Sequence, residues 1–286
     1  MARIAIIGGG SMGEALLAGV LRAGRRARDV VVSERVPDRA DYLSRTYSVR
    51  VLPVREALEG AEFVILAVKP GDVESVVAEI AAAATAAERS SVEQVLVSVA
   101  AGKTTAFFEA RLPAGTPVIR VMPNTPALVG AGVSALAAGR FATGEQLAQA
   151  AELFTSVGLA LTVPESQIDA VTAVSGSGPA YFFLFVEALV DAGVAAGLSR
   201  AVATDLAMQT MAGSSAMLLD RRAAAGTGSA RQPDTTAAEL RALVTSPGGT
   251  TAAGLRELER GGLRAAVAAA VEAAKTRSEQ LGITSE

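Results

Sequence analysis

The sequence contains no cysteine and no histidine, and charged residues make up only 19% of its 286 positions. Without cysteine, disulfides and thiolate metal sites are excluded, and without histidine the chain lacks the commonest metal ligand and proton shuttle. We therefore expect no metal site. A formal net charge of −3 also makes nucleic acid an unexpected partner, and we interpret the basic run at residues 22–28 as a solvated helix end.

Long apolar runs without charge are scarce as well. The N-terminal segment has about five apolar residues before glycine intervenes, too few for the core of a signal peptide. The longest apolar stretch, residues 179–198, contains Glu187 and Asp191, which are costly in hydrocarbon. We therefore expect a buried helix there instead of a membrane span, and a cytoplasmic protein.

Length and hydrophobic pattern predict two domains. A chain of 286 residues exceeds the usual size of one domain. Over the first 120 residues, short apolar runs alternate with helical patterns, which predicts an α/β domain with a parallel sheet buried on both faces. Beyond about Pro164 only helical patterns remain, so we expect domains of residues 1–163 (α/β) and 164–286 (all-α). The expected strands cover residues 3–8, 30–33, 63–68, 94–99 and 117–122, with 132–138 and 159–163 as additional edge strands.

A glycine motif directly follows the first expected strand. Gly8, Gly10 and Gly13 in "IAIIGGGSMG" have the G-x-G-x-x-G spacing, and a helical pattern follows at once. The first glycine of such a motif permits a tight turn, the second lets the backbone approach a pyrophosphate, and the third lets the helix pack on the strand. We therefore expect a Rossmann-type domain whose cofactor loop consists of Gly8, Gly9, Gly10, Ser11, Met12 and Gly13.

The end of the second strand bears on which dinucleotide binds. NAD enzymes usually place a carboxylate there, whereas the 2′-phosphate of NADP needs hydroxyl and cationic donors. Ser33 and Arg35 favour NADP, because Ser33 is nearest the carboxylate position and Arg35 carries a suitable charge. Glu34 leaves NAD as an alternative cofactor, because a carboxylate that points inward would favour NAD over NADP.

A second glycine stretch, "AAGKTT" at residues 100–105, resembles the end of a P-loop. The first glycine of a P-loop would fall at position 97, which is valine. We therefore interpret the stretch as the loop after a strand, which places Ala100 at the carboxyl edge of the sheet, where ligands of such folds bind.

Further loops place small or helix-starting residues just beyond apolar segments. They are "AVKPGD" (67–72), "VMPNTPA" (121–127), "AVSGSGPAYFF" (173–183) and "VTSPGGTTAAGL" (244–255). Caps and turns alone would explain any one of them. Together, in order and spacing, they closely resemble the pyrroline-5-carboxylate reductases over essentially the whole chain. The "SPGGTT" loop preceded by "SGSGPAY" is quite specific to that family, whereas the glycine motif is not.

The resemblance implies a Rossmann domain followed by a helical domain that dimerises through interlocking helices, in some members building decamers. It also implies reduction of 1-pyrroline-5-carboxylate to L-proline, with NADPH or alternatively NADH as the donor. Substrate contacts carry over to Ser175, Gly176, Ser177, Gly178, Pro179, Ser246, Pro247, Gly248, Gly249, Thr250 and Thr251. Cofactor contacts carry over to residues 8–13, Ser33, Ala67, Val68, Lys69, Pro70 and Asn124, and we add Arg35 and Ala100 from the strand-end arguments.

This chemistry suits a chain without histidine. Backbone N–H groups at a helix start, here residues 248–251, bind a carboxylate without a cationic side chain. A protonated imine is already electrophilic, and hydride transfer to it leaves a neutral amine, so no side chain must donate a proton. We expect Thr251 to supply the one hydroxyl that faces the ring nitrogen.

Several positions leave alternatives open. Val54 stands where the family often has an asparagine that touches the adenine ribose, which puts that contact in doubt. Lys69 and Arg120 either orient the cofactor and loops or pair with carboxylates such as Glu14 or Glu165. The long loop at residues 221–236 is expected at the surface, without a catalytic role.

Two other functions compete with this interpretation. A β-hydroxyacid dehydrogenase would share the two-domain plan but commonly uses a lysine of its helical domain in acid–base catalysis. The only lysines here are Lys69, Lys103 and Lys275, and none closely follows "SGSGPA". A non-enzymatic NADP-sensing dimer would keep the glycine motif without needing "SPGGTT".

Overall fold

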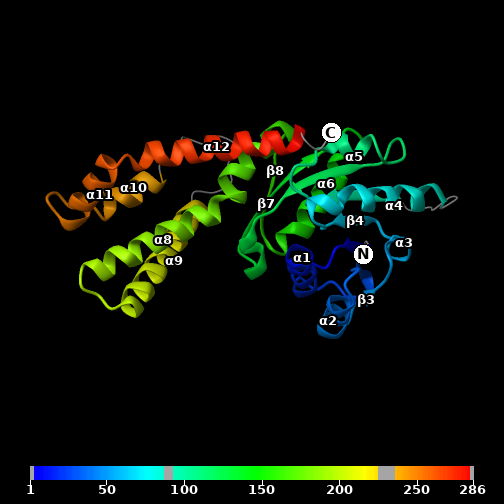
Figure 1. The fold of residues 1–286 in the computed structure, drawn as a ribbon, viewed down its shortest axis with the longest axis horizontal. Helices are drawn as coiled ribbons and strands as arrows, with labels where there is room; N and C mark the ends of the chain where they lie inside the picture. The colour runs from blue at the N-terminus through cyan, green and yellow to red at the C-terminus, as the bar shows by residue number, and fades with distance from the viewer. Residues whose placement is uncertain (1–2, 87–92, 225–235, 284–286) are drawn as a thin grey trace. The chain divides into compact units, whose positions relative to one another are not determined.

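The computed structural model describes residues 3–86, 93–224 and 236–283. The chain forms two compact units, one of Met1–Pro179 with Val271–Glu286 and one of Ala180–Ala270. Figure 1 traces the elements along the chain. The domain boundary near residue 163 stays a prediction, and the compact units divide later because Ile168 packs with the sheet residues Ala135 and Ala137. The loop expected at residues 221–236 lies largely outside the described residues.

The first unit is built on an eight-stranded sheet with the order β3-β2-β1-β4-β5-β6-β7-β8. All neighbouring pairs are parallel except β6 and β7. The predicted α/β fold is therefore confirmed. The strands are β1 (Ile4–Ile7), β2 (Val30–Ser33), β3 (Arg50–Val51), β4 (Phe63–Leu66), β5 (Val95–Ser98), β6 (Val118–Met122), β7 (Gly132–Ala138) and β8 (Gly158–Thr162).

Two features of the sheet differ from the expectation. Strand β7 runs antiparallel to β6 and is not an edge strand, because β8 pairs with its far side. Only the short 3₁₀ turn η3 (Thr125–Val129) lies between β6 and β7, too little chain for a parallel crossover. Strand β3 was not predicted, because its two residues are too few to show a periodic pattern.

Alternate residues of the strands fill two hydrophobic layers. Ile4 and Ile6 face one cluster while Ala5 and Ile7 face the other, which is why the strands read as continuous apolar runs. Each fully buried Ile or Leu side chain stabilises the fold by about 1.5–3 kcal/mol. The first layer is covered by α1 (Ser11–Arg22), α2 (Pro37–Tyr47) and α6 (Gly144–Thr155), and the second by α3 (Val54–Ala57), α4 (Val73–Ala86) and α5 (Thr105–Glu109).

Helices follow β8 throughout the rest of the described chain, as predicted. The short α7 (Ile168–Val171) belongs to the first unit. The second unit contains α9, α10 and α11, most of α8, and the start of α12. Their bounds are α8 (Gly178–Ala195), α9 (Arg200–Ala224), α10 (Thr236–Leu243), α11 (Thr250–Arg260) and α12 (Leu263–Ile283).

Helix α8 corrects one expectation. The segment at residues 179–198 was predicted to be buried, but Phe182, Phe183 and Leu184 are 62%, 68% and 66% exposed in the single chain. The prediction is wrong because, among the residues that the structure describes, the buried apolar cluster against α8 is small and centres on Ala203 and Ala207 of α9. By length and composition alone, the helical run Glu165–Ala195 also qualifies as a membrane span, and 17% of the apolar 18-residue stretch within it is buried.

The pairing of β7 with β8 depends on a glycine that admits no side chain. Gly158 has φ +143°, and a Cβ atom there would lie 2.0 Å from the Gly132 carbonyl oxygen. We expect Gly158→Ala to lower the free energy of unfolding by about 2–3 kcal/mol, measured by urea denaturation. Gly144→Ala at the start of α6 is the matched control, because a Cβ there meets no atom within 4 Å. Equal stability of the two variants would contradict the argument.

Candidate cofactor and substrate site

The glycine loop, residues 8–13, packs closely against the sheet and the start of α1. Gly8 has φ +105°, and a Cβ there would lie 2.6 Å from the Ala67 carbonyl oxygen. A Cβ at Gly13 would lie 2.0 Å from the Gly8 carbonyl oxygen, so α1 can approach the loop only with glycine at this position. By contrast, a Cβ at Gly10 would meet no atom within 4 Å. The open space at Gly10 lies beside the first-turn N–H groups of α1, which have no acceptor within the helix.

Two further loops lie at the same edge of the sheet as the glycine loop, at the carboxyl ends of β4 and β5. The N–H of Ala67 donates to the Ile7 carbonyl at 2.8 Å, and the N–H of Val99 donates to the Leu66 carbonyl at 3.0 Å. These bonds place Ala67 beside Gly8 at the ends of β4 and β1, and Ala100 one strand further along, at the end of β5. The structure thus brings the predicted cofactor residues of three separate segments to one edge of the sheet.

The two charged residues after β2 point to different partners. The Glu34 carboxylate accepts hydrogen bonds from the N–H groups of Gly9 at 2.9 Å and Val36 at 2.8 Å, so it points inward to the glycine loop. The Arg35 guanidinium lies 3.0 Å from the carboxylate of Asp72, which belongs to the short turn that precedes α4. An inward-pointing Glu34 is the arrangement that was expected to favour NAD. The Arg35 guanidinium, expected to bind the 2′-phosphate of NADP, forms an ion pair with Asp72.

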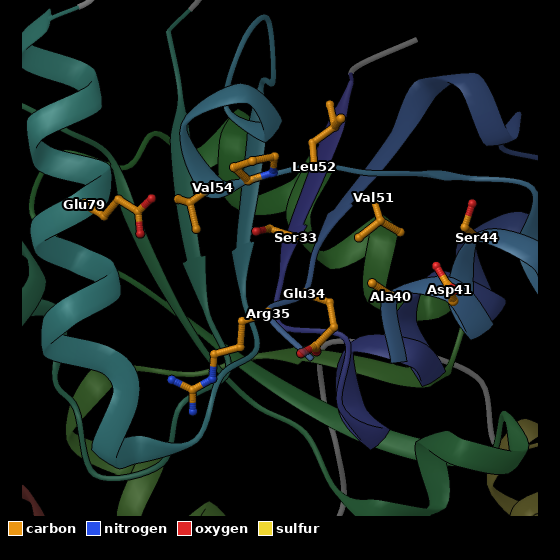
Figure 2. A pocket seen from close by; sticks show the side chains of 11 residues that line it. Ser33, Glu34, Arg35, Ala40, Asp41, Ser44, Val51, Leu52, Val54 and Glu79 are labelled. Carbon is orange, nitrogen blue, oxygen red and sulfur yellow. The ribbon is translucent and has the colours of Figure 1, made fainter. Parts of the chain in front are cut away.

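A pocket of about 550 Å³ opens beside these residues (Figure 2). Val54, which replaces the asparagine expected from the family, is part of its wall. Three carboxylates and one guanidinium line it, so its charge is mainly negative. No pattern in the sequence indicated Asp41 and Ser44 of α2, which enter the pocket only because α2 starts close to the end of β2. The lining residues are Ser33, Glu34, Arg35, Ala40, Asp41, Ser44, Val51, Leu52, Pro53, Val54 and Glu79.

Arg39 of α2 is a site residue that the sequence analysis missed. Its Nε donates to the Gly9 carbonyl at 2.7 Å, and its guanidinium pairs with Glu14 of α1. The Tyr47 hydroxyl donates to the same Glu14 carboxylate at 2.8 Å. Glu14 is therefore the partner of Arg39, and this cluster ties the glycine loop to two helices.

The ionisation of this cluster follows from its contacts. Burial acts to raise the pKa of Glu14, but hydrogen bonds from Arg39, Tyr47 and Tyr42 hold that pKa below its ordinary value. Burial, together with the hydrogen bond to the Glu14 carboxylate, raises the pKa of Tyr47 to about 12. Glu14 is thus held charged and Tyr47 neutral across the physiological pH range.

Arg120 takes the second of its two expected roles. Its Nη1 lies 3.0 Å from Oε1 of Glu165, and only 5% of Arg120 is exposed. The same carboxylate oxygen accepts the N–H of Thr105 at 3.2 Å. This partly buried pair ties β6 to the turn η4 (Glu165–Gln167), from which the chain leads to residues 175–179. Lys69, by contrast, is exposed.

The first predicted substrate loop, residues 175–179, follows a π-helical turn over Thr172–Gly176 and enters α8. Asn124, predicted to contact the cofactor, lies against this turn. Its Nδ2 donates to the Ser175 carbonyl at 3.1 Å, and its Oδ1 accepts the N–H of Val133 at 2.9 Å. A cofactor contact of Asn124 stays a prediction, and its observed partners are two backbone groups.

The second predicted substrate loop, residues 246–251, forms a turn that leads into α11, as expected. Gly248 has φ +70°, which favours glycine, and the N–H of Gly249 donates to the Ser246 carbonyl at 3.1 Å. Helix α11 begins at Thr250, so the N–H groups of Thr250 and Thr251 lie in its first turn. This loop belongs to the second compact unit and residues 175–179 belong to the first.

The raised pKa of Tyr47 leads to a test of the cluster around the glycine loop. An unfolded tyrosine has a pKa of about 10, so protonated Tyr47 stabilises the fold fully below that pH, and the contribution is lost as the pH rises towards 12. We expect the free energy of unfolding of the unmodified chain to fall more steeply between these pH values than that of Tyr47→Phe. Urea denaturation at several pH values measures both, and equal slopes would refute the assignment.

Comparisons with known proteins agree with this arrangement. A family model described as pyrroline-5-carboxylate reductase dimerisation matches residues 165–281. A model described as NADP oxidoreductase, coenzyme F420-dependent, matches residues 3–102. The pyrroline-5-carboxylate reductase of Mycobacterium tuberculosis is 67% identical over 100% of this chain and 99% of its own length. That of Corynebacterium melassecola is 43% identical over 99% of each chain.

Solved structures extend the similarity to the fold. A pyrroline-5-carboxylate reductase from Coxiella burnetii superposes with a TM-score of 0.87 at 34% identity, covering 98% of each chain. A pyrroline carboxylate reductase from Plasmodium falciparum, solved with NADP bound, gives a TM-score of 0.79 at 29% identity and also covers 98% of each chain. The identity to the curated relatives and its extent over the full length establish that this chain belongs to the pyrroline-5-carboxylate reductase family.

Proposed function

We propose that this chain reduces 1-pyrroline-5-carboxylate to L-proline by hydride transfer from NADPH, with NADH as the alternative donor. This is the last step of proline biosynthesis. The observation that carries the proposal is the turn at residues 246–251, which opens α11 with free first-turn N–H groups and no cationic side chain in the turn. Membership of the family supports it, and neither the β-hydroxyacid dehydrogenase nor the NADP sensor accounts for this loop.

The residues around the glycine loop fit a dinucleotide. The open space at Gly10 and the first turn of α1 suit a pyrophosphate, because helix N-termini attract anions. When bound, the reduced nicotinamide supplies the hydride. We assign Ser33 and Arg35 to a 2′-phosphate, and the Plasmodium falciparum relative was solved with NADP. The inward Glu34 carboxylate opposes that phosphate and keeps NADH as a second donor.

The substrate is an acid with a cyclic imine. We assign its carboxylate to the N–H groups of residues 248–251, with help from residues 175–179. Thr251 places its hydroxyl at the ring nitrogen and orients the C=N bond for attack. Because hydride addition to the protonated imine gives a neutral amine, these residues need to hold and orient the substrate without donating a proton.

The exposed apolar face of α8 fits a second copy of the chain. Phe182 and Phe183 expose more apolar surface than a monomeric soluble protein usually does, which indicates an interface. The charged residues Glu187 and Asp191 on the same helix disfavour insertion of this helix into a membrane. The matching family model is described as a dimerisation model. We propose a cytoplasmic homodimer, with a decamer as its higher assembly, and neither nucleic acid nor membrane as a partner.

The role of Thr251 has a direct kinetic test. Removing one hydrogen bond to the substrate costs about 1–3 kcal/mol, so Thr251→Ala should lower kcat/KM for 1-pyrroline-5-carboxylate by roughly tenfold to a hundredfold. Thr251→Ser is the matched control, because it keeps the hydroxyl and should retain most of the activity. Steady-state oxidation of NADPH measures both variants. An unchanged rate in Thr251→Ala would remove this residue from the mechanism.

The nucleotide preference tests the two charged residues after β2. Losing the guanidinium that faces a 2′-phosphate should raise KM for NADPH about threefold to fivefold in Arg35→Ala while leaving KM for NADH unchanged, because Arg35 only exchanges one exposed ion pair for another. Glu34→Gln should lower KM for NADPH, because it removes a negative charge. Arg28→Ala, at an exposed arginine in the turn before β2, controls for the loss of one positive charge. Equal changes for both nucleotides in Arg35→Ala would rule out the 2′-phosphate contact.

A further inference from the structure

The first substrate loop contains a carbonyl group that its own helix cannot satisfy. The π-helical turn over Thr172–Gly176 is closed by the Ser177 N–H, which donates to the Thr172 carbonyl at 2.8 Å. In the α-helical register that follows, the Ser175 carbonyl would accept from the N–H of residue 179. That residue is proline, which has no N–H. A half-buried backbone carbonyl in this position needs a donor from elsewhere.

Asn124 is that donor. Its Nδ2 lies 3.1 Å from the Ser175 carbonyl oxygen, and its Oδ1 accepts the N–H of Val133 at 2.9 Å. One partner is a carbonyl and the other an N–H, so only one orientation of the carboxamide satisfies both. Asn124 is also the only asparagine in the 286-residue sequence. An aspartate would keep the bond to Val133 but would bring a second acceptor to Ser175.

A second contact fixes the same turn against the same strand end. A Cβ atom at Gly176 would lie 2.7 Å from Cε of Met122, the last residue of β6. Met122 and Asn124 therefore both lie against the turn, one by packing and the other by hydrogen bonding. Together, these two contacts fix the position of the turn relative to the edge of the sheet at which the cofactor loops lie.

We propose that Asn124 is a positioning residue that replaces the N–H missing at Pro179 and thereby holds residues 175–179 in their substrate-binding orientation. The inference rests on the proposed function. It assigns Asn124 to the substrate loop, acting through Ser175, instead of to direct contact with the dinucleotide. π-Helical turns recur at functional sites, and here the unusual turn has a dedicated side chain that completes its hydrogen bonds.

Kinetics and cofactor binding separate the two roles. Asn124→Ala and Asn124→Asp should each lower kcat/KM for 1-pyrroline-5-carboxylate by roughly tenfold to a hundredfold, as expected for a misplaced binding loop. The dissociation constant for NADPH, measured by fluorescence titration, should stay within about twofold of the original value, because no cofactor contact is lost. Gln149→Ala, at an exposed amide on α6, is the control. A loss of NADPH affinity equal to the loss of kcat/KM would overturn the proposal.

Pro179 provides a second test through a double-mutant cycle. Pro179→Ala restores an N–H that can donate to the Ser175 carbonyl. Asn124→Ala should therefore lower kcat/KM by a smaller factor in the Pro179→Ala background than in the original chain. Additive effects of the two substitutions would show that the two groups do not serve the same carbonyl and would overturn the proposal.

A third measurement needs no turnover. Because the chain has one asparagine, labelling with side-chain ¹⁵N-asparagine gives a single amide NH₂ pair in an NMR spectrum. One proton of that pair should exchange slowly with solvent, and its exchange should quicken in Pro179→Ala, where a second donor competes for Ser175. Fast exchange of both protons in the original chain would overturn the positioning role, even if Asn124→Ala does not fold. An inactive original chain with a protected amide would instead contradict the proposed function alone.

Discussion

Close packing at Gly8 and Gly13 is the constraint on which the cofactor end of the sheet depends. The Gly8 carbonyl fills the space that a side chain at Gly13 would need, and Gly8 lies against the Ala67 carbonyl. The N–H of Gly8 also donates to the Ser33 carbonyl at 2.8 Å. One short loop therefore fixes the ends of β1, β2 and β4 together. Because α1 must start at this loop, its free N–H groups face the edge where all three strands end.

The charged residues near this edge hold the backbone in place. Arg39 donates to the Gly9 carbonyl and is itself fixed by Glu14, which also accepts from Tyr47. Arg120 has a similar role at β6, where Glu165 joins it to the Thr105 N–H. A protein that binds anions with main-chain N–H groups needs those groups held rigidly. The absence of histidine fits the proposed function, in which side chains hold the main chain in place and main-chain N–H groups bind the ligands.

The sequence predicted what depends on local pattern and missed what depends on tertiary contacts. The apolar runs located seven strands, and the glycine spacing located the loop before α1, because both are set by nearby residues. The direction of β7 was missed, since alternation does not encode strand direction. Arg39 was missed because its partner, Gly9, is 30 residues away. The exposure of α8 was mistaken for burial, because a helix covered by its own chain and one left for another subunit have the same composition.

The preference between NADPH and NADH is a balance of two neighbouring charges. A 2′-phosphate must replace Asp72 as the partner of Arg35, whose side chain is 77% exposed. Exchanging one exposed ion pair for another changes the free energy by only about 1 kcal/mol or less. Glu34 acts in the opposite direction, because its carboxylate is held inward by the N–H groups of Gly9 and Val36. Neither contribution is large enough to exclude one nucleotide, so the proposed contacts imply only a modest selectivity between the two donors.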